Sequence, residues 1–113
     1  MSETAKAFER GLAGLHRDPT GRPVMEKFRL LHEAALSDGA LSRTIKELMA
    51  LCVSITSQCD GCIAWHIQGA IRAGASREQV VETINLAILM GGGPATYYGS
   101  KALAELDRAS STE

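Results

Sequence analysis

Apolar residues recur every three or four positions along this chain, and no segment alternates apolar and polar side chains with the period of two typical of a half-buried strand. Clusters of proline, glycine and small polar residues interrupt the helical pattern at 16–23, 37–39 and 91–94. We therefore predict an all-α fold of five or six helices. The expected helices cover residues 3–15, 24–36, 42 or 44 to 57, 60–73, 76–91 and 94–107.

Length and charge narrow the class of protein. The 113 residues suit one domain, 1–113, and leave too little length for a second core. With 12 basic and 13 acidic residues the net charge is −1, and Lys and Arg do not cluster, which argues against a nucleic-acid partner. No apolar run approaches the ~20 residues that span a bilayer, and no export signal opens the chain. We expect a cytoplasmic protein without a membrane partner, a cofactor or a bound metal.

The third expected helix is the most apolar one. Almost every position between Leu48 and Ile55 is apolar or small, which predicts burial on most of its faces. A chain this short, with 45% hydrophobic residues, has more apolar surface than a small monomer easily hides. Assembly into an oligomer is therefore compatible with the composition.

Two cysteines and a histidine follow that helix. Cys62 and His66 are four residues apart, so a shared helix places them on one face, where an imidazole activates a thiol. Cys62 also falls in the first helical turn, whose partial positive charge favours a thiolate. Both effects predict a lowered pKa for Cys62. Cys59 stands three residues earlier, and a dithiol in a chain without secretion signals indicates redox chemistry.

Glu47 has two interpretations. With Thr44 it has the spacing of a capping box, in which it reaches back to free N–H groups at the start of the helix. Alternatively it is a carboxylate at the edge of the core that takes part in proton transfer. The local sequence favours the cap. An idealised antiparallel hairpin would also place Glu47 opposite about Ala70, roughly one 5.4 Å turn beyond His66, so helix geometry alone does not predict that these two residues meet.

Three other uses of a Cys-x-x-Cys pair fit the sequence less well. Thioredoxin has its pair where a strand meets a helix, and no strand is expected here. Haem attachment needs a histidine directly after the second cysteine, where this chain has Ile63. A structural zinc ion needs four ligands, whereas Cys59, Cys62 and His66 supply three. The sequence offers no fourth ligand at a spacing typical of zinc sites.

The remaining motifs have simpler interpretations. His16 and His32 lie in segments where a surface or packing histidine is the expected role. The glycine run 91–93 lacks the Lys-Ser/Thr of a phosphate-binding loop and follows a helix, so it predicts a turn.

The pattern formed by Glu47, Cys59, Cys62 and His66 resembles the signature of the alkylhydroperoxidase D group, within the carboxymuconolactone decarboxylase-like superfamily. The likeness extends over roughly residues 24–106. It implies the all-helical fold of that superfamily, a homotrimer or homohexamer, and a thiol-dependent peroxidase or disulfide reductase.

The resemblance also implies a role for each residue of the signature. The Cys62 thiolate would attack a hydroperoxide and become a sulfenic acid, on which Cys59 condenses to form a disulfide. His66 would accept the thiol proton and Glu47 would orient the imidazole. The reverse assignment of the two cysteines stays open. Reduction would come from a dihydrolipoamide-bearing or thioredoxin-like partner.

One position departs from the family pattern. Gly61 stands where well-described relatives have a second histidine, so one link of the proton relay is missing and a high peroxidase rate is not implied. A redox-sensing or scaffold oligomer without fast turnover is therefore an alternative function. Lactone decarboxylation, the reaction of the superfamily's other branch, is a weaker alternative because that branch does not use a Cys-x-x-Cys pair.

Overall fold

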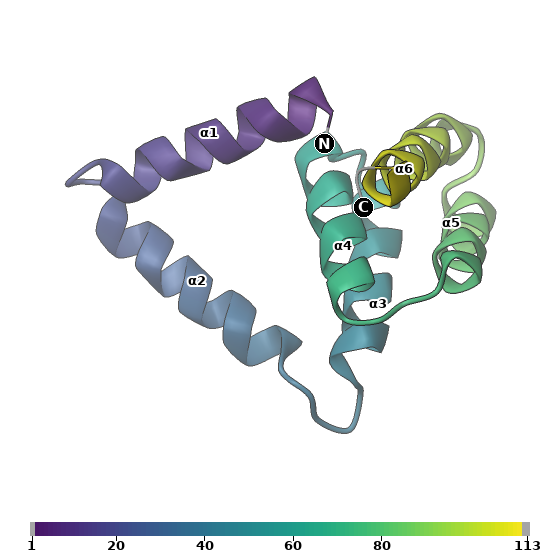
Figure 1. The fold of residues 1–113 in the computed structure, drawn as a ribbon, viewed down its shortest axis with the longest axis horizontal. Coiled ribbons are helices and arrows are strands. Elements are labelled where there is room, and N and C mark those ends of the chain that lie inside the picture. Colours follow the sequence, from purple (N-terminus) through teal and green to yellow (C-terminus); the bar gives the residue numbers. More distant parts are fainter. Residues whose placement is uncertain (1, 112–113) are drawn as a thin grey trace.

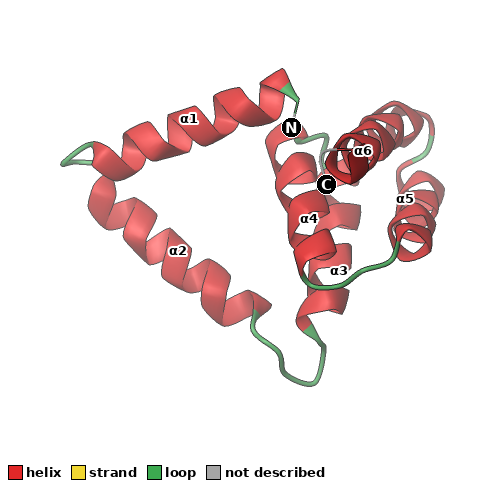
Figure 2. Ribbon diagram, viewed as in Figure 1, coloured by secondary structure: helices red, strands yellow, loops and turns green. Residues whose placement is uncertain are grey.

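The fold is built from helices alone. A computed structural model describes residues 2–111, and within that range it contains six α-helices and no strand (Figures 1 and 2). The helices are α1 Glu3–Arg17, α2 Arg22–Leu36, α3 Arg43–Thr56, α4 Asp60–Arg72, α5 Arg77–Gly91 and α6 Gly93–Ser111. The predicted all-α class and helix order are confirmed.

Helix ends follow the capping signals in the sequence. The capping box at Ser76 is present: its hydroxyl accepts the Gln79 N–H, and the Gln79 side chain accepts the Ser76 N–H. Gly74 has φ of +95°, a left-handed conformation that suits glycine in the loop after α4. At the start of α3 the cap is Ser42, which accepts the Ile45 N–H.

The hydrophobic core lies among α3, α4, α5 and α6, which gather on one side of the molecule (Figure 1). Leu51 and Ile55 of α3 and Ile67 of α4 are fully buried there, as is Val80 of α5. α3 and α4 form an antiparallel hairpin, and the Thr44 hydroxyl donates to the Ala73 carbonyl oxygen at 2.6 Å, which ties the start of α3 to the end of α4. This hairpin carries the four residues of the signature.

α1 and α2 diverge from the core, as Figure 2 shows. α1 reaches α4 through Phe8, whose ring meets the Trp65 ring edge-on at a centroid distance of 5.3 Å. α2 leaves Val24, Leu30 and Leu31 more than half exposed. Within residues 2–111, no helix has the length and apolar character needed to cross a membrane.

Candidate functional site

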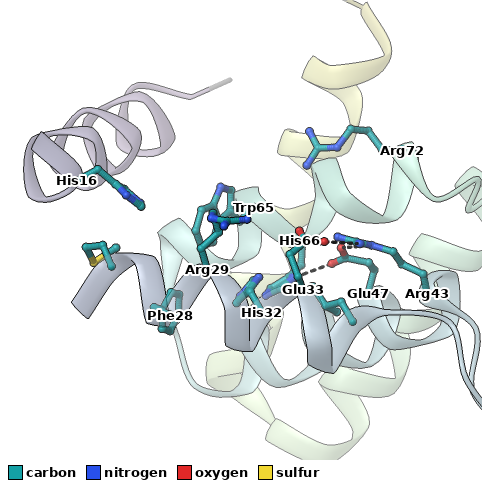
Figure 3. A pocket seen from close by; sticks show the side chains of 12 residues that line it. His16, Phe28, Arg29, His32, Glu33, Arg43, Glu47, Trp65, His66 and Arg72 are labelled. Carbon is teal, nitrogen blue, oxygen red and sulfur yellow. Dashed lines mark hydrogen bonds and ion pairs between the residues drawn. The ribbon is translucent and has the colours of Figure 1, made fainter. Parts of the chain in front are cut away.

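The carboxylate of Glu47 is buried and bonded to His66. Glu47 is 3% exposed, and its Oε1 lies 2.8 Å from His66 Nδ1 (Figure 3). The capping interpretation of Glu47 is therefore wrong, because Ser42 caps α3 and Thr44 bonds across the hairpin to Ala73. A carboxylate only accepts hydrogen bonds, so the imidazole donates from Nδ1, and Nε2 is the ring nitrogen that does not take part in this bond.

Gly69 makes this contact reachable. A Cβ atom at position 69 would lie 2.6 Å from Glu47 Oε1, so any other residue there would occupy the space of the carboxylate. The idealised hairpin placed Glu47 one turn beyond His66. α3 and α4 are nonetheless continuous helices, and the Glu47 side chain covers the remaining turn by passing over Gly69. The sequence signal was a glycine in a helix interior, which costs about 1 kcal/mol relative to alanine.

A second charge accompanies the Glu47 carboxylate. Arg43, one turn earlier on α3, has its Nε 3.8 Å from Glu47 Oε2 and its Nη1 3.7 Å from Glu33 Oε2 on α2. Burial of an ionised carboxylate is costly unless it is paired and hydrogen-bonded. Arg43 and His66 together meet that requirement.

The two cysteines of the motif lie at the start of α4 with free thiols. Cys59 is the N-cap residue, and its Sγ accepts the Cys62 N–H at 3.4 Å. Burial raises the pKa of Cys62 to about 11, with a further contribution from the adjacent Cys59. The predicted lowering of this pKa is therefore wrong. The Cys62 N–H, in the first turn of α4, donates to Cys59 Sγ, and within residues 2–111 no hydrogen bond joins the Cys62 and His66 side chains.

The glycine between the cysteines has a structural cause. A Cβ atom at position 61 would lie 2.7 Å from Cδ2 of Phe8, so the α1 ring occupies the space into which a side chain would project. A histidine at position 61 therefore requires Phe8 to move. The packing of α1 on α4 through Phe8 therefore leaves no room for an imidazole at position 61.

His32 of α2 lies at the site itself. Its ring stacks on that of His66 with a centroid distance of 6.0 Å and an interplanar angle of 17°, and it also contacts Trp65 at 5.4 Å. The expectation of a packing histidine holds, but the group on which it packs is the candidate base. Sequence spacing gave no signal for this contact, because α2 and α4 are far apart in the chain.

A cavity of about 330 Å³ adjoins the Glu47–His66 pair (Figure 3). α2, α3 and α4 supply most of its walls, and α1 adds one histidine. The lining residues are His16, Met25, Phe28, Arg29, His32, Glu33, Leu36, Arg43, Glu47, Trp65, His66 and Arg72. The volume falls in the range of small-molecule sites, and the aromatic and charged lining suits a ligand with unlike ends.

The model of the carboxymuconolactone decarboxylase family matches residues 22–105. The chain belongs to the carboxymuconolactone decarboxylase family. This confirms the predicted relationship to the superfamily. Among curated relatives, an uncharacterized protein of Cupriavidus necator is 42% identical over 84 residues, or 74% of each chain. Uncharacterized protein 4 in the cox locus of Paracoccus denitrificans is 40% identical over 87 residues, covering 77% of this chain and 78% of its own.

Solved structures of the family share this fold. A family protein from Legionella pneumophila is 36% identical with a TM-score of 0.85, covering 92% of this chain and 91% of that one. A family protein from Thermotoga maritima, for which involvement in an antioxidative response has been suggested, is 30% identical with a TM-score of 0.72. That match covers 77% of this chain and 90% of the Thermotoga chain. The six-helix architecture is thus that of the carboxymuconolactone decarboxylase family.

Proposed function

We propose that this family member is a thiol-dependent peroxidase and disulfide reductase whose redox centre is the Cys59–Cys62 pair. The observation that carries the proposal is the buried Glu47–His66 pair, with a 2.8 Å bond, one helical turn from Cys62. Cys59 Sγ lies 3.4 Å from the backbone nitrogen of Cys62, which supports a role for Cys59 in resolving a sulfenic acid on Cys62. The antioxidative response suggested for the Thermotoga relative is in keeping with this chemistry.

Cys62 is the attacking residue in this proposal, and its raised pKa means that the attack needs a base. With a pKa of about 11, the thiol carries its proton at neutral pH. His66, held by Glu47 through Nδ1, takes that proton at Nε2. The sulfur then bonds to the outer oxygen of the hydroperoxide and the O–O bond breaks. The departing alkoxide takes a proton to become an alcohol, and Cys62 becomes a sulfenic acid.

Cys59 completes the oxidative half of the cycle. Its sulfur attacks the Cys62 sulfenic acid, the S–O bond breaks, and the hydroxide takes the Cys59 proton and leaves as water. An external dithiol, carried by a dihydrolipoamide-bearing or thioredoxin-like partner, then reduces the disulfide by thiol exchange and is itself oxidised. The cycle uses no cofactor. Cys59 caps α4 and accepts the Cys62 N–H, so it also lies at the helix start, and the reverse assignment of the thiols is an outcome of the test.

The test is a titration of the reduced protein with cumene hydroperoxide, followed by mass spectrometry of the intact chain. We expect the wild type to lose about two mass units as the disulfide forms. Cys59→Ser should accumulate a trappable sulfenic acid, whereas Cys62→Ser should not. Cys52→Ser, which removes the third cysteine outside the motif, is the matched control and should behave as wild type. A wild type that never loses these mass units contradicts the peroxidase proposal, and a sulfenic acid found only in Cys62→Ser reverses the two roles.

A redox-sensing or scaffold oligomer is the second candidate function. The raised pKa of Cys62 and the absence of an imidazole at position 61 favour it, because both slow the attack on a peroxide. Disulfide formation that takes hours rather than seconds would support this candidate. The lactone decarboxylation that gives the family its name has no use for the Cys59–Cys62 pair and is the weakest of the three. Within the described range, no group of three or more His, Cys, Asp or Glu side chains is arranged to hold a metal ion, so the zinc alternative gains no support.

A further inference from the structure

The cavity beside Glu47 and His66 has two unlike ends. Phe28 and Trp65 line one end, and Arg43 and Arg72 line the other (Figure 3). Arg43 and Arg72 also line a smaller hollow together with Glu47, so both residues border the same region. Trp65 and Arg72 are seven residues apart on α4, two turns along one face, so the ends are roughly 10 Å apart along the helix. Such a cavity suits an elongated ligand with an apolar body and a charged end.

Arg72 is the arginine of this cavity that has no counter-ion among residues 2–111. Arg43 is paired with Glu33 and Glu47, and Arg29 is paired with a glutamate one turn away on α2. Among residues 2–111, by contrast, no side chain or carbonyl forms a hydrogen bond or ion pair with the Arg72 guanidinium, which is exposed at the cavity. A planar guanidinium binds a carboxylate through two parallel hydrogen bonds. The free charge therefore matches one carboxylate group.

The size and charge of the cavity limit the ligand further. A volume of about 330 Å³ is at the small end of the range for ligand sites, so the ligand is a small molecule. Glu33 and Glu47 at the same cavity repel a second negative charge, which disfavours a dicarboxylate or a doubly charged phosphate. Burial of an apolar body between the Phe28 and Trp65 rings is favourable.

We propose that the cavity binds a monocarboxylate with an apolar body, its carboxylate on Arg72 and its body against Phe28 and Trp65. If the peroxidase function proposed above holds, the substrate is an organic hydroperoxide that carries a carboxylate. Its bulk lies along α4 beside His66, one turn from Cys62.

Binding is tested without the redox chemistry, in a Cys62→Ser background. 4-Isopropylbenzoate is a rigid monocarboxylate of suitable size, and 4-isopropylbenzamide is its neutral counterpart. Trp65 is the only tryptophan of the chain, so its fluorescence reports ligand at this cavity, and calorimetry supplies the dissociation constants. We expect the carboxylate to bind at least about tenfold more tightly than the amide, the gain of a charge-assisted pair.

Two variants locate the two ends of the ligand, and a third is their control. Arg72→Gln should remove the preference for the carboxylate and leave amide binding unchanged. Phe28→Ala should weaken both ligands by a similar factor. Arg10→Gln removes one positive charge from an exposed α1 position that does not line the cavity, and it should change neither constant. Equal binding of carboxylate and amide to the wild-type cavity, or the same loss in Arg10→Gln as in Arg72→Gln, overturns the proposal.

Turnover separates this inference from the proposed function. In the chain with both thiols, the para-carboxylate of cumene hydroperoxide should be reduced with a kcat/KM about tenfold above that of cumene hydroperoxide, and Arg72→Gln should abolish the difference. If the carboxylate binds as expected but neither hydroperoxide oxidises Cys62, the peroxidase function fails and the binding site stands. If both hydroperoxides are reduced equally well, the substrate assignment is wrong and the peroxidase stands.

Discussion

The Glu47 carboxylate occupies a space that only a glycine at position 69 leaves open. The register of the α3–α4 hairpin places Glu47 a turn away from His66, and the two side chains meet because nothing projects from Gly69 between them. At this scale a residue without a side chain is as important for the Glu47–His66 contact as the two residues that form it. The local sequence favoured a capping role for Glu47, and the family resemblance implied that it orients His66. Neither indicated the space that Gly69 leaves in front of the carboxylate.

Gly69→Ala should therefore disrupt the site even though alanine is the better helix former. The added methyl group displaces the carboxylate, which breaks its bond to His66 and should slow oxidation of Cys62 by about 100-fold. Overpacking of this kind costs about 1–3 kcal/mol of unfolding free energy. Gly11→Ala is the matched control: nothing lies within 4 Å of a Cβ atom there, so the change should stabilise α1 by up to about 1 kcal/mol. Urea unfolding followed by circular dichroism measures the unfolding free energy of both variants. Equal stabilisation of the two variants would contradict the close approach of the Glu47 carboxylate to position 69.

The Cys62 thiol gives a second prediction at the scale of single residues. Its pKa is raised to about 11 by burial and by Cys59, so Cys59→Ser should lower it while the contribution of burial persists. Below the pKa, the thiolate fraction rises tenfold per pH unit, and the rate of alkylation by iodoacetamide should rise with it. The rate at Cys62, followed by peptide mass spectrometry, should still be increasing at about pH 10 in the wild type and should level off at lower pH in Cys59→Ser. A wild-type midpoint at or below the ordinary value of about 8.5 would show that the thiol is activated after all.

At the scale of elements, the site lies on the α3–α4 hairpin, and α1 and α2 add side chains to it. Helical periodicity and capping signals were sufficient to predict five or six helices and their order, because those signals are local in the chain. Those local signals could not predict which residues of α3 and α4 are contacted by α1 and α2. Phe8 on Gly61 and His32 on His66 join segments more than 30 residues apart, and neither has a local pattern that reports its partner. The lowered pKa predicted for Cys62 was wrong for a similar reason. Burial raises this pKa, and burial depends on the tertiary packing around the thiol.

At the scale of the whole molecule, a large apolar surface is left uncovered. Met49 and Val53 of α3 are 53% and 64% exposed, and Leu89 and Met90 of α5 are 75% and 73% exposed. An apolar groove of about 350 Å³ lies between these two helices. Monomeric soluble proteins rarely expose large apolar patches, and such patches mark protein–protein interfaces. α3 was predicted to be buried on most of its faces, and this is wrong for the single chain, where Met49 and Val53 are more than half exposed. We propose that another copy covers this side of α3 in a homotrimer or homohexamer.

Assembly can be broken at the centre of that surface. We expect the purified protein to have a mass three or six times that of the 12.0 kDa chain by light scattering coupled to size exclusion. Val53→Asp places a charge on the apolar face of α3, where burial against a second copy would desolvate it, so this variant should run at a lower mass. Its helix content should not change, because Val53 is exposed in the single chain. Ala7→Asp adds the same charge at an exposed α1 position and should leave the mass of the assembly unchanged. A wild type that stays monomeric at tens of micromolar, or a Val53→Asp variant that assembles as the wild type does, would exclude the α3–α5 surface as the interface between copies.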